Sequence, residues 1–183
     1  YFRRSDKGGI DYIAPEDVDV ERDSQGRITG GRSRKDGEAV EYDGLGTMSK
    51  SKLNGVDPQD MISLYGADAA RMFVMFASPP EQTIEWSANG VEGSQRFLRR
   101  LWTFAQSHAP TIGSASAGRE LDRAAAATRR EIHLALKQAN YDYERIQYNT
   151  VVSAGMKMLN ALEQLDVAAQ GYAQVIDEGV SIL

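Results

Sequence analysis

Apolar residues recur at helical spacing through much of the second half of the sequence. In three stretches an apolar side chain returns every three or four positions, which places these side chains on one face of an α-helix. The stretches lie near residues 97–105, 121–139 and 151–165. Helices of this length joined by short turns predict an antiparallel bundle, with a fourth helix beginning near Ala168. We predict that the apolar faces, Trp102 and Met158 included, form a buried core, and that a Gly/Ser-rich linker occupies residues 113–118.

The first part of the sequence has a different pattern. Between Asp17 and Tyr42, short runs rich in Val, Ile and Thr alternate with turn signals such as Asp23-Ser24-Gln25-Gly26 and Lys35-Asp36-Gly37. This alternation predicts a small β-hairpin or β-meander. Its apolar residues are too few for it to fold well alone, so we expect an insertion that rests on a larger body. The predicted fold class is therefore α+β.

A segment without periodicity separates these two parts. Gly44-Leu45-Gly46 and Asn54-Gly55 bracket small, polar and basic residues, which predicts a mobile loop. Asp57-Pro58 then predicts a helix start, with Asp57 as N-cap and Pro58 at the first helical position, and Gly66 ends that helix. A second short helix is predicted over residues 67–77, before Pro79-Pro80.

The loop has the composition of a phosphate-binding segment. It offers two ammonium groups and two hydroxyl groups, and its candidate nucleotide-binding residues are Met48, Ser49, Lys50, Ser51 and Lys52. The pattern of a Walker loop is missing. A flexible lysine loop suits a reaction in which negative charge grows on a leaving pyrophosphate and a cation must close over it.

The loop resembles the Lys-Met-Ser-Lys-Ser signature of the class I aminoacyl-tRNA synthetases. Thr47 stands where the family's first lysine usually is, so the contribution of that lysine is in question here, with Lys52 as a partial substitute. Lys50 matches the second lysine, which in the family is the more important one for activating ATP. The resemblance implies that Lys50 is the catalytic residue of this chain.

The resemblance continues on both sides of the loop. The segments after it are similar to the stem-contact region of the leucyl, isoleucyl and valyl enzymes: Asn54-Gly55-Val56-Asp57-Pro58, Tyr65-Gly66-Ala67-Asp68, Ala77-Ser78-Pro79 and Glu85-Trp86-Ser87. Gly90-Val91-Glu92-Gly93 followed by Arg96-Phe97-Leu98 narrows the resemblance to the leucyl-tRNA synthetase family. Pro15-Glu16-Asp17-Val18 and Gly26-Arg27-Ile28 resemble strands of the leucine-specific insertion of bacterial leucyl enzymes, which isoleucyl and valyl enzymes lack.

This resemblance implies a division into three parts. Residues 1–46 would be part of the β-rich leucine-specific insertion, residues 47–93 the signature loop and stem-contact region, and residues 94–183 a truncated helical bundle of the anticodon-binding type. The chain would be a fragment of a leucine-tRNA ligase, a cytoplasmic and monomeric enzyme that uses ATP and Mg²⁺ to form leucyl-adenylate and transfers leucine to tRNA(Leu). Because the family's His-Ile-Gly-His signature, leucine pocket and editing domain are missing, we expect the fragment alone to be inactive.

The charge distribution points to an RNA-binding face within an acidic chain. The net charge of -5 argues against a nucleic-acid partner, but residues 94–149 hold nine Lys or Arg against five Asp or Glu. In leucyl enzymes this bundle is thought to touch the tRNA body, so the resemblance implies phosphate contacts without base readout. The alternative for each arginine is a solvated helix face with local acidic partners. The candidate residues are Arg96, Arg99, Arg100, Arg129, Arg130 and Arg145.

Composition excludes several other classes of function. The sequence has no cysteine, and His108 and His133 are far apart, so we expect no disulfide and no metal site. No apolar run approaches the roughly 20 residues that span a bilayer, and no signal-peptide pattern opens the sequence, so we expect a soluble, cytosolic protein. Because the sequence begins at Tyr1 and stops within helical, apolar character at Leu183, we expect both ends to continue in a longer protein.

Two alternatives remain open from the sequence. The chain could be a non-enzymatic tRNA-binding module whose signature loop is vestigial. It could also be part of an isoleucyl- or valyl-tRNA synthetase, a reading that would be favoured if residues 1–46 formed a disordered linker rather than a sheet.

Overall fold

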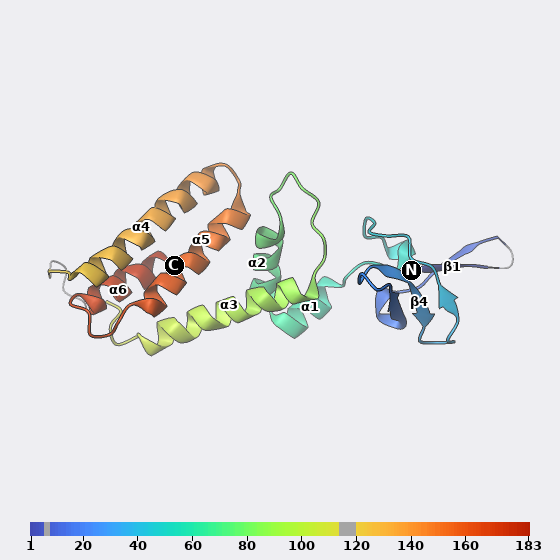
Figure 1. Cartoon of the computed structure of the whole chain (residues 1–183), viewed down its shortest axis with the longest axis horizontal. Helices are drawn as coiled ribbons and strands as arrows, with labels where there is room; N and C mark the ends of the chain where they lie inside the picture. The colour runs from blue at the N-terminus through green and yellow to red at the C-terminus, as the bar shows by residue number, and fades with distance from the viewer. Residues whose placement is uncertain (6–7, 114–119) are drawn as a thin grey trace. The chain divides into compact units, whose positions relative to one another are not determined.

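The computed structural model describes residues 1–5, 8–113 and 120–183, so most of the predicted linker at residues 113–118 lies outside the described residues. The chain divides into two compact units, Tyr1–Asp60 and Met61–Leu183. The first is built from short antiparallel strands and the second from α-helices (Figure 1). The predicted α+β class is confirmed.

Five short strands form the first unit. They are β1 (Phe2–Arg4), β2 (Ile10–Tyr12), β3 (Val18–Arg22), β4 (Ile28–Ser33) and β5 (Ala39–Val40). Strands β1 and β2 make an antiparallel hairpin, while β3, β4 and β5 form an antiparallel meander in that order. Two backbone hydrogen bonds between Phe2 and Glu41 link the hairpin to the end of the meander.

The meander has a very small core, as its sequence predicted. Val18 and Val40 are its buried apolar side chains among the described residues, and Ser33 is buried beside them. Gly31 lies so close to the neighbouring strand that a Cβ there would stand 2.6 Å from both the Asp19 carbonyl oxygen and Val18 Cγ1. The dependence of this sheet on a larger body stays a prediction.

The β1–β2 hairpin was not predicted from the sequence. Its strands carry Phe2-Arg3-Arg4 and Ile10-Asp11-Tyr12, which are too short and too charged to show an apolar alternation. Ion pairs stabilise it instead, because Arg3 Nη1 lies 2.6 Å from Asp36 Oδ2 and 2.7 Å from Glu38 Oε2. The guanidinium of Arg3 lowers the pKa of Asp36 to about 2, mainly through this hydrogen bond.

Six α-helices follow in the described part of the chain, and the second unit begins within the first of them. They are α1 (Pro58–Tyr65), α2 (Ala67–Ala77), α3 (Ala88–Ser107), α4 (Arg123–Glu144), α5 (Tyr148–Gln164) and α6 (Tyr172–Ile182). Helices α4 and α5 are joined by a short turn and pack antiparallel, and α6 packs against both (Figure 1). Helix α2 packs against α3 and α5.

The predicted helix boundaries agree with the structure. The Asp57 carboxylate accepts a hydrogen bond of 2.7 Å from the Gln59 N–H at the start of α1. Gly66 ends α1 with a positive φ of 88°, a backbone conformation that glycine adopts without a steric penalty. Ser87 caps α3 by accepting from the Gly90 N–H at 3.1 Å.

The largest core lies where α4, α5 and α6 meet. Met158 is buried there as predicted, and the most fully buried large side chains include Ile132, Leu159, Leu162 and Ile176. Phe97, Leu101 and Phe104 of α3 pack against this core.

The prediction that Trp102 belongs to the core is wrong. Its side chain is 71% exposed. The inward face of α3 runs through Phe97, Leu101 and Phe104, which are separated by four and three residues. Trp102 is turned by about 100° from Leu101 around the helix axis and therefore faces outward.

Candidate nucleotide-binding loop and basic helix faces

The predicted phosphate-binding segment forms a single tight turn. Residues Lys50–Lys52 make a 3₁₀ turn, in which the Lys52 N–H donates to the Ser49 carbonyl at 3.1 Å and the Leu53 N–H donates to the Lys50 carbonyl at 3.2 Å. Leu53 ends the turn in the left-handed region, with φ 53°. The hydroxyl oxygens of Ser49 and Ser51 lie 2.9 Å apart. The two serines and two lysines are thereby gathered on one turn.

Asn54 closes this turn with its side chain. Its Oδ1 accepts from the Ser49 N–H at 2.7 Å, and its Nδ2 donates to the Thr47 carbonyl at 3.3 Å. The Asn54-Gly55 pattern in the sequence indicates a turn and does not predict this role of Asn54. An Asn within five residues of the polar loop was the available signal, since its short amide side chain readily bonds to nearby backbone.

Lys50 and Lys52 are both exposed. No ion pair is recorded for either ammonium group within the described part of the chain, whereas Lys35 of the same unit is paired with Asp17 at 2.7 Å. Met48 and Leu53 beside them are 47% and 51% exposed. The turn therefore presents two uncompensated positive charges and two hydroxyl groups, which is a suitable surface for the oxygens of a polyphosphate.

On α3, three of the predicted RNA-binding arginines lie together. Arg96, Arg99 and Arg100 line an open groove of about 540 Å³ with Thr103, Ser107 and Glu163. Arg100 pairs with Glu163 at 3.0 Å and also bonds to Asn160 of α5, while Arg96 lies 3.5 Å from Glu92. Arg99 is exposed, and no side-chain partner is recorded for it among the described residues.

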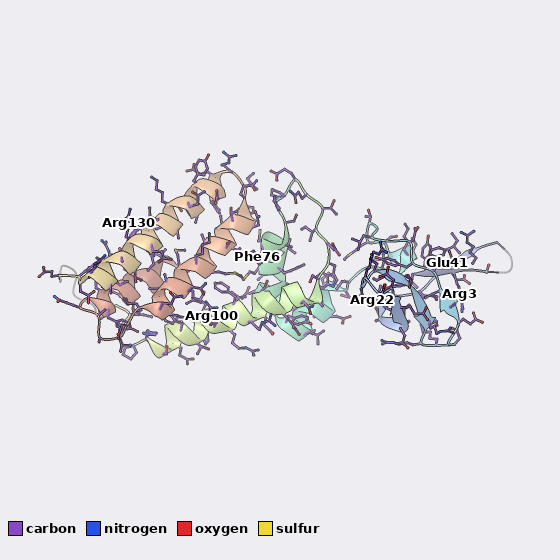
Figure 2. The ribbon with its side chains drawn as sticks, in the orientation of Figure 1. Arg3, Arg22, Glu41, Phe76, Arg100 and Arg130 are labelled. Carbon is purple, nitrogen blue, oxygen red and sulfur yellow. The ribbon has the colours of Figure 1, made fainter. Side chains whose placement is uncertain are left out.

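The other three arginines belong to α4 and its C-terminal end. Arg129 makes a two-pronged pair with Glu178 of α6 at 2.6 and 2.9 Å, and this pair raises the pKa of Arg129 and lowers that of Glu178. Arg145 lies over the ring of Tyr141 at 5.2 Å and donates to its hydroxyl at 2.7 Å. Arg130 is exposed, and Figure 2 shows it and Arg100 on two different helices.

The structure thus does not bring the six arginines into one cluster. Arg100 and Arg129 tie helices together through carboxylates, whereas Arg99 and Arg130 have no recorded carboxylate partner among the described residues. His133 also contacts Glu178, at 2.7 Å. It therefore lies at the α4–α6 contact.

The described parts of the chain contain neither a metal-binding cluster nor a membrane-spanning helix. No group of three or more His, Cys, Asp or Glu side chains is placed so that it could hold a metal ion. None of the described helices combines the length and the apolar character needed to cross a membrane.

Part of the chain matches the model of a known protein family. Residues 39–87, which contain the whole lysine turn and the first two helices, match the family model of the class I tRNA synthetases for isoleucine, leucine, methionine and valine. This segment of the chain is therefore similar to the class I tRNA synthetases.

Curated relatives that match all or nearly all of the chain are leucine--tRNA ligases. The sequence is 57% identical to the leucine--tRNA ligase of Leptothrix cholodnii over 100% of the chain and 21% of that protein. It is 54% identical to the enzyme of Bordetella petrii over 94% of the chain and 20% of that protein. The chain is homologous to a region of the leucine--tRNA ligases and spans about a fifth of the length of these curated relatives.

A solved structure has a similar fold. The LeuRS of Agrobacterium radiobacter K84, crystallised as a ternary complex with tRNA and LeuAMS, matches 73% of this chain and 17% of its own with a TM-score of 0.62. The sequence identity is 24%, so this likeness supports the fold.

Proposed function

We propose that this chain forms the part of a leucine--tRNA ligase that closes over ATP while leucine is activated. The observation that carries the proposal is the turn at residues 47–52, which presents unpaired lysines within the segment that matches the class I family model. The whole enzyme would convert leucine and ATP into leucyl-adenylate and pyrophosphate, and then transfer leucine to tRNA(Leu).

Lys50 is the proposed catalytic residue. Its ammonium group would neutralise the charge that develops on the β- and γ-phosphates as the bond to the α-phosphate breaks. Ser49 and Ser51 would donate hydroxyl hydrogen bonds to phosphate oxygens, with Lys52 supplying a second cation near Thr47, and Met48 would position the turn. Mg²⁺ would arrive bound to the phosphates of ATP.

The helical unit is proposed to bind the body of the tRNA through phosphates. Arg99 and Arg130 are the best placed candidates, since neither is recorded in an ion pair with a carboxylate of the described chain. Arg96 and Arg145 are exposed and partly engaged, by Glu92 and Tyr141. Arg100 and Arg129 would have to exchange their carboxylate partners for phosphate, so we rank them last.

The division into a leucine-specific insertion at 1–46, a signature loop and stem-contact region at 47–93, and an anticodon-binding-type bundle at 94–183 remains our proposal for the functional parts. We also propose that the whole enzyme is a cytoplasmic monomer. The chain by itself should not catalyse adenylation, because its lysine turn would act on a nucleotide that the rest of the enzyme holds.

The experiment is amino-acid-dependent exchange of pyrophosphate into ATP by the full-length protein. Leucine, isoleucine, valine and methionine would be compared at equal concentration. We expect leucine to support the fastest exchange. Equal or faster exchange with isoleucine or valine would contradict the proposal in favour of a neighbouring enzyme.

The alternative of a non-enzymatic tRNA-binding module is not favoured, because the relatives that match the whole chain are leucine--tRNA ligases. The same experiment separates the two. A full-length protein that binds tRNA but exchanges no pyrophosphate with any of the four amino acids would support the module.

A further inference from the structure

Trp102 is an exposed aromatic side chain without a partner in the described chain. The indole is 71% exposed, and no ring contact or side-chain hydrogen bond is recorded for it among the described residues. Trp86, the other tryptophan, packs edge-on against Phe73 with ring centroids 5.2 Å apart. A large aromatic side chain with a free N–H donor, held outward on a long helix, is typical of a contact residue rather than of a core residue.

The surroundings of Trp102 are basic and polar. Arg99 precedes it by three residues and Gln106 follows it by four, so all three share one exposed face of α3. Arg99 also lines the groove of about 540 Å³, with Thr103 and Ser107. Glu163, the carboxylate that lines this groove, is paired with Arg100, and no carboxylate partner is recorded for Arg99 among the described residues. The charge of Arg99 is therefore left uncompensated beside an exposed ring.

This combination fits a nucleotide whose base is not stacked on a neighbour. Proteins bind such bases by stacking them on aromatic rings and hold the adjacent phosphate with a cation. A purely apolar partner would leave the guanidinium of Arg99 buried and unpaired, which is costly. The positive charge therefore favours RNA over an apolar protein surface.

We propose that Trp102 and Arg99 together bind one unpaired nucleotide of the tRNA, with the base stacked on the indole and the phosphate on the guanidinium. This inference rests on the proposed function, because it takes tRNA as the ligand of the helical unit. It adds a base contact to a surface from which the sequence analysis expected phosphate contacts alone.

The test measures binding of a tRNA(Leu) transcript to full-length variants by fluorescence anisotropy at several salt concentrations. Trp102→Ala should raise Kd about fivefold or more, while Trp102→Phe, which keeps a ring, should retain most of the affinity. Arg99→Ala should weaken binding and reduce the salt dependence by about one phosphate contact. Val167→Ala, which removes a 77% exposed apolar side chain after the end of α5, is the matched control and should leave Kd unchanged.

Chemical probing of the bases in each complex supplies a second measurement. One unpaired base protected by the wild type and by Trp102→Phe should become reactive in Trp102→Ala. If Trp102→Ala binds tRNA with wild-type Kd and the same protection, the proposal is overturned. A Trp102→Ala protein that loses thermal stability but keeps its tRNA affinity also overturns it, in favour of a contact with another part of the protein.

Leucine-dependent pyrophosphate exchange by the same variants separates this inference from the proposed function. Adenylate formation precedes the transfer to tRNA and does not require the proposed base contact. If Trp102→Ala shows both normal exchange and unchanged tRNA binding, this inference is contradicted while the proposed function stands. Absence of exchange in the wild type would sink the proposed function.

Discussion

Asn54 bonds to both sides of the turn that carries Lys50, although its own side chain is not a candidate phosphate ligand. It accepts from the Ser49 N–H and donates to the Thr47 carbonyl, five and seven residues earlier. A cation stabilises a developing charge best when its position is fixed before the reaction. The amide of Asn54 would therefore act as a positioning group for Lys50.

Replacing Asn54 by Ala should slow leucine activation without removing any charge. Two hydrogen bonds are lost, each worth about 1 kcal/mol, so we expect a decrease of roughly tenfold to thirtyfold in the rate of adenylate formation. The measurement is single-turnover adenylate formation by the full-length protein. Asn140→Ala, at an exposed position of α4, is the control, and an unchanged rate in Asn54→Ala would show that the turn does not need this side chain.

Residue roles were the least predictable part of the site. The lysines and serines of the turn could be named from their chemical types alone. Asn54 could not, because a turn pattern does not reveal which backbone groups its amide reaches. The prediction that Trp102 is buried was wrong for a related reason. Leu101 and Trp102 are adjacent apolar residues, which lie about 100° apart around the helix axis, so the sequence does not show which of them faces the core.

At the scale of elements, the short helices could be predicted because Pro and Gly residues mark where they begin and end. Helix α2 spans Ala67–Ala77 as expected, because Gly66 and the Pro79-Pro80 pair bound it. Strands β1 and β2 carried no such signal, and ion pairs of Arg3 with Asp36 and Glu38 link β1 to residues more than thirty positions away. Interactions over that sequence distance are not visible in a local pattern.

The contact of α6 with α5 requires glycine at position 179, because a larger residue would collide with the neighbouring helix. A Cβ at Gly179 would lie 2.5 Å from Leu162 Cδ2, and Leu162 is buried. Gly179→Ala should therefore destabilise the helical unit by about 1 to 3 kcal/mol through overpacking. Gly155→Ala is the matched control, because its added Cβ would meet only Leu183 Cδ2 at 3.9 Å, and helix propensity should make it neutral or stabilising by up to about 1 kcal/mol. Urea denaturation followed by circular dichroism measures both, and equal stability of the two variants would contradict this account of the packing.

The contact of α6 with α4 should depend on pH. The hydrogen bond from Arg129 is the main cause that lowers the pKa of Glu178 below its usual value of 4.5, and His133 contributes in the same direction. A carboxyl with a lowered folded-state pKa stabilises the fold above its unfolded pKa and loses that contribution as the pH falls through the folded value. We therefore expect stability to decline below about pH 4.5, and the decline to be smaller in Glu178→Gln.

Thermal unfolding between pH 3 and pH 7 would measure this dependence. Glu131→Gln, at an exposed position of α4 with no recorded ion pair in the described chain, should keep the wild-type profile. The same profile in Glu178→Gln as in wild type would mean that the Arg129–Glu178 pair does not stabilise the fold.

At the scale of the whole molecule, the chain consists of two compact units, and each carries a different candidate binding surface. The unit Tyr1–Asp60 carries the lysine turn, and the unit Met61–Leu183 carries the basic helix faces. The similarity to leucine--tRNA ligases and the α+β class could be predicted from the sequence because the motifs and the helical pattern extend over nearly all of it. Which arginines are free to bind a ligand could not be predicted, because Arg100 and Arg129 are engaged by carboxylates from α5 and α6, which only the folded arrangement shows.

The central claim is that Lys50 stabilises the leaving pyrophosphate in the complete enzyme. The most direct measurement is leucine-dependent pyrophosphate exchange by full-length wild type, Lys50→Ala and Lys137→Ala, the last being an exposed lysine of α4 that serves as control. We predict that Lys50→Ala slows exchange by roughly a hundredfold or more, which corresponds to the loss of one preorganised charge in the transition state, while Lys137→Ala keeps the wild-type rate. Exchange at the wild-type rate in Lys50→Ala would contradict the account.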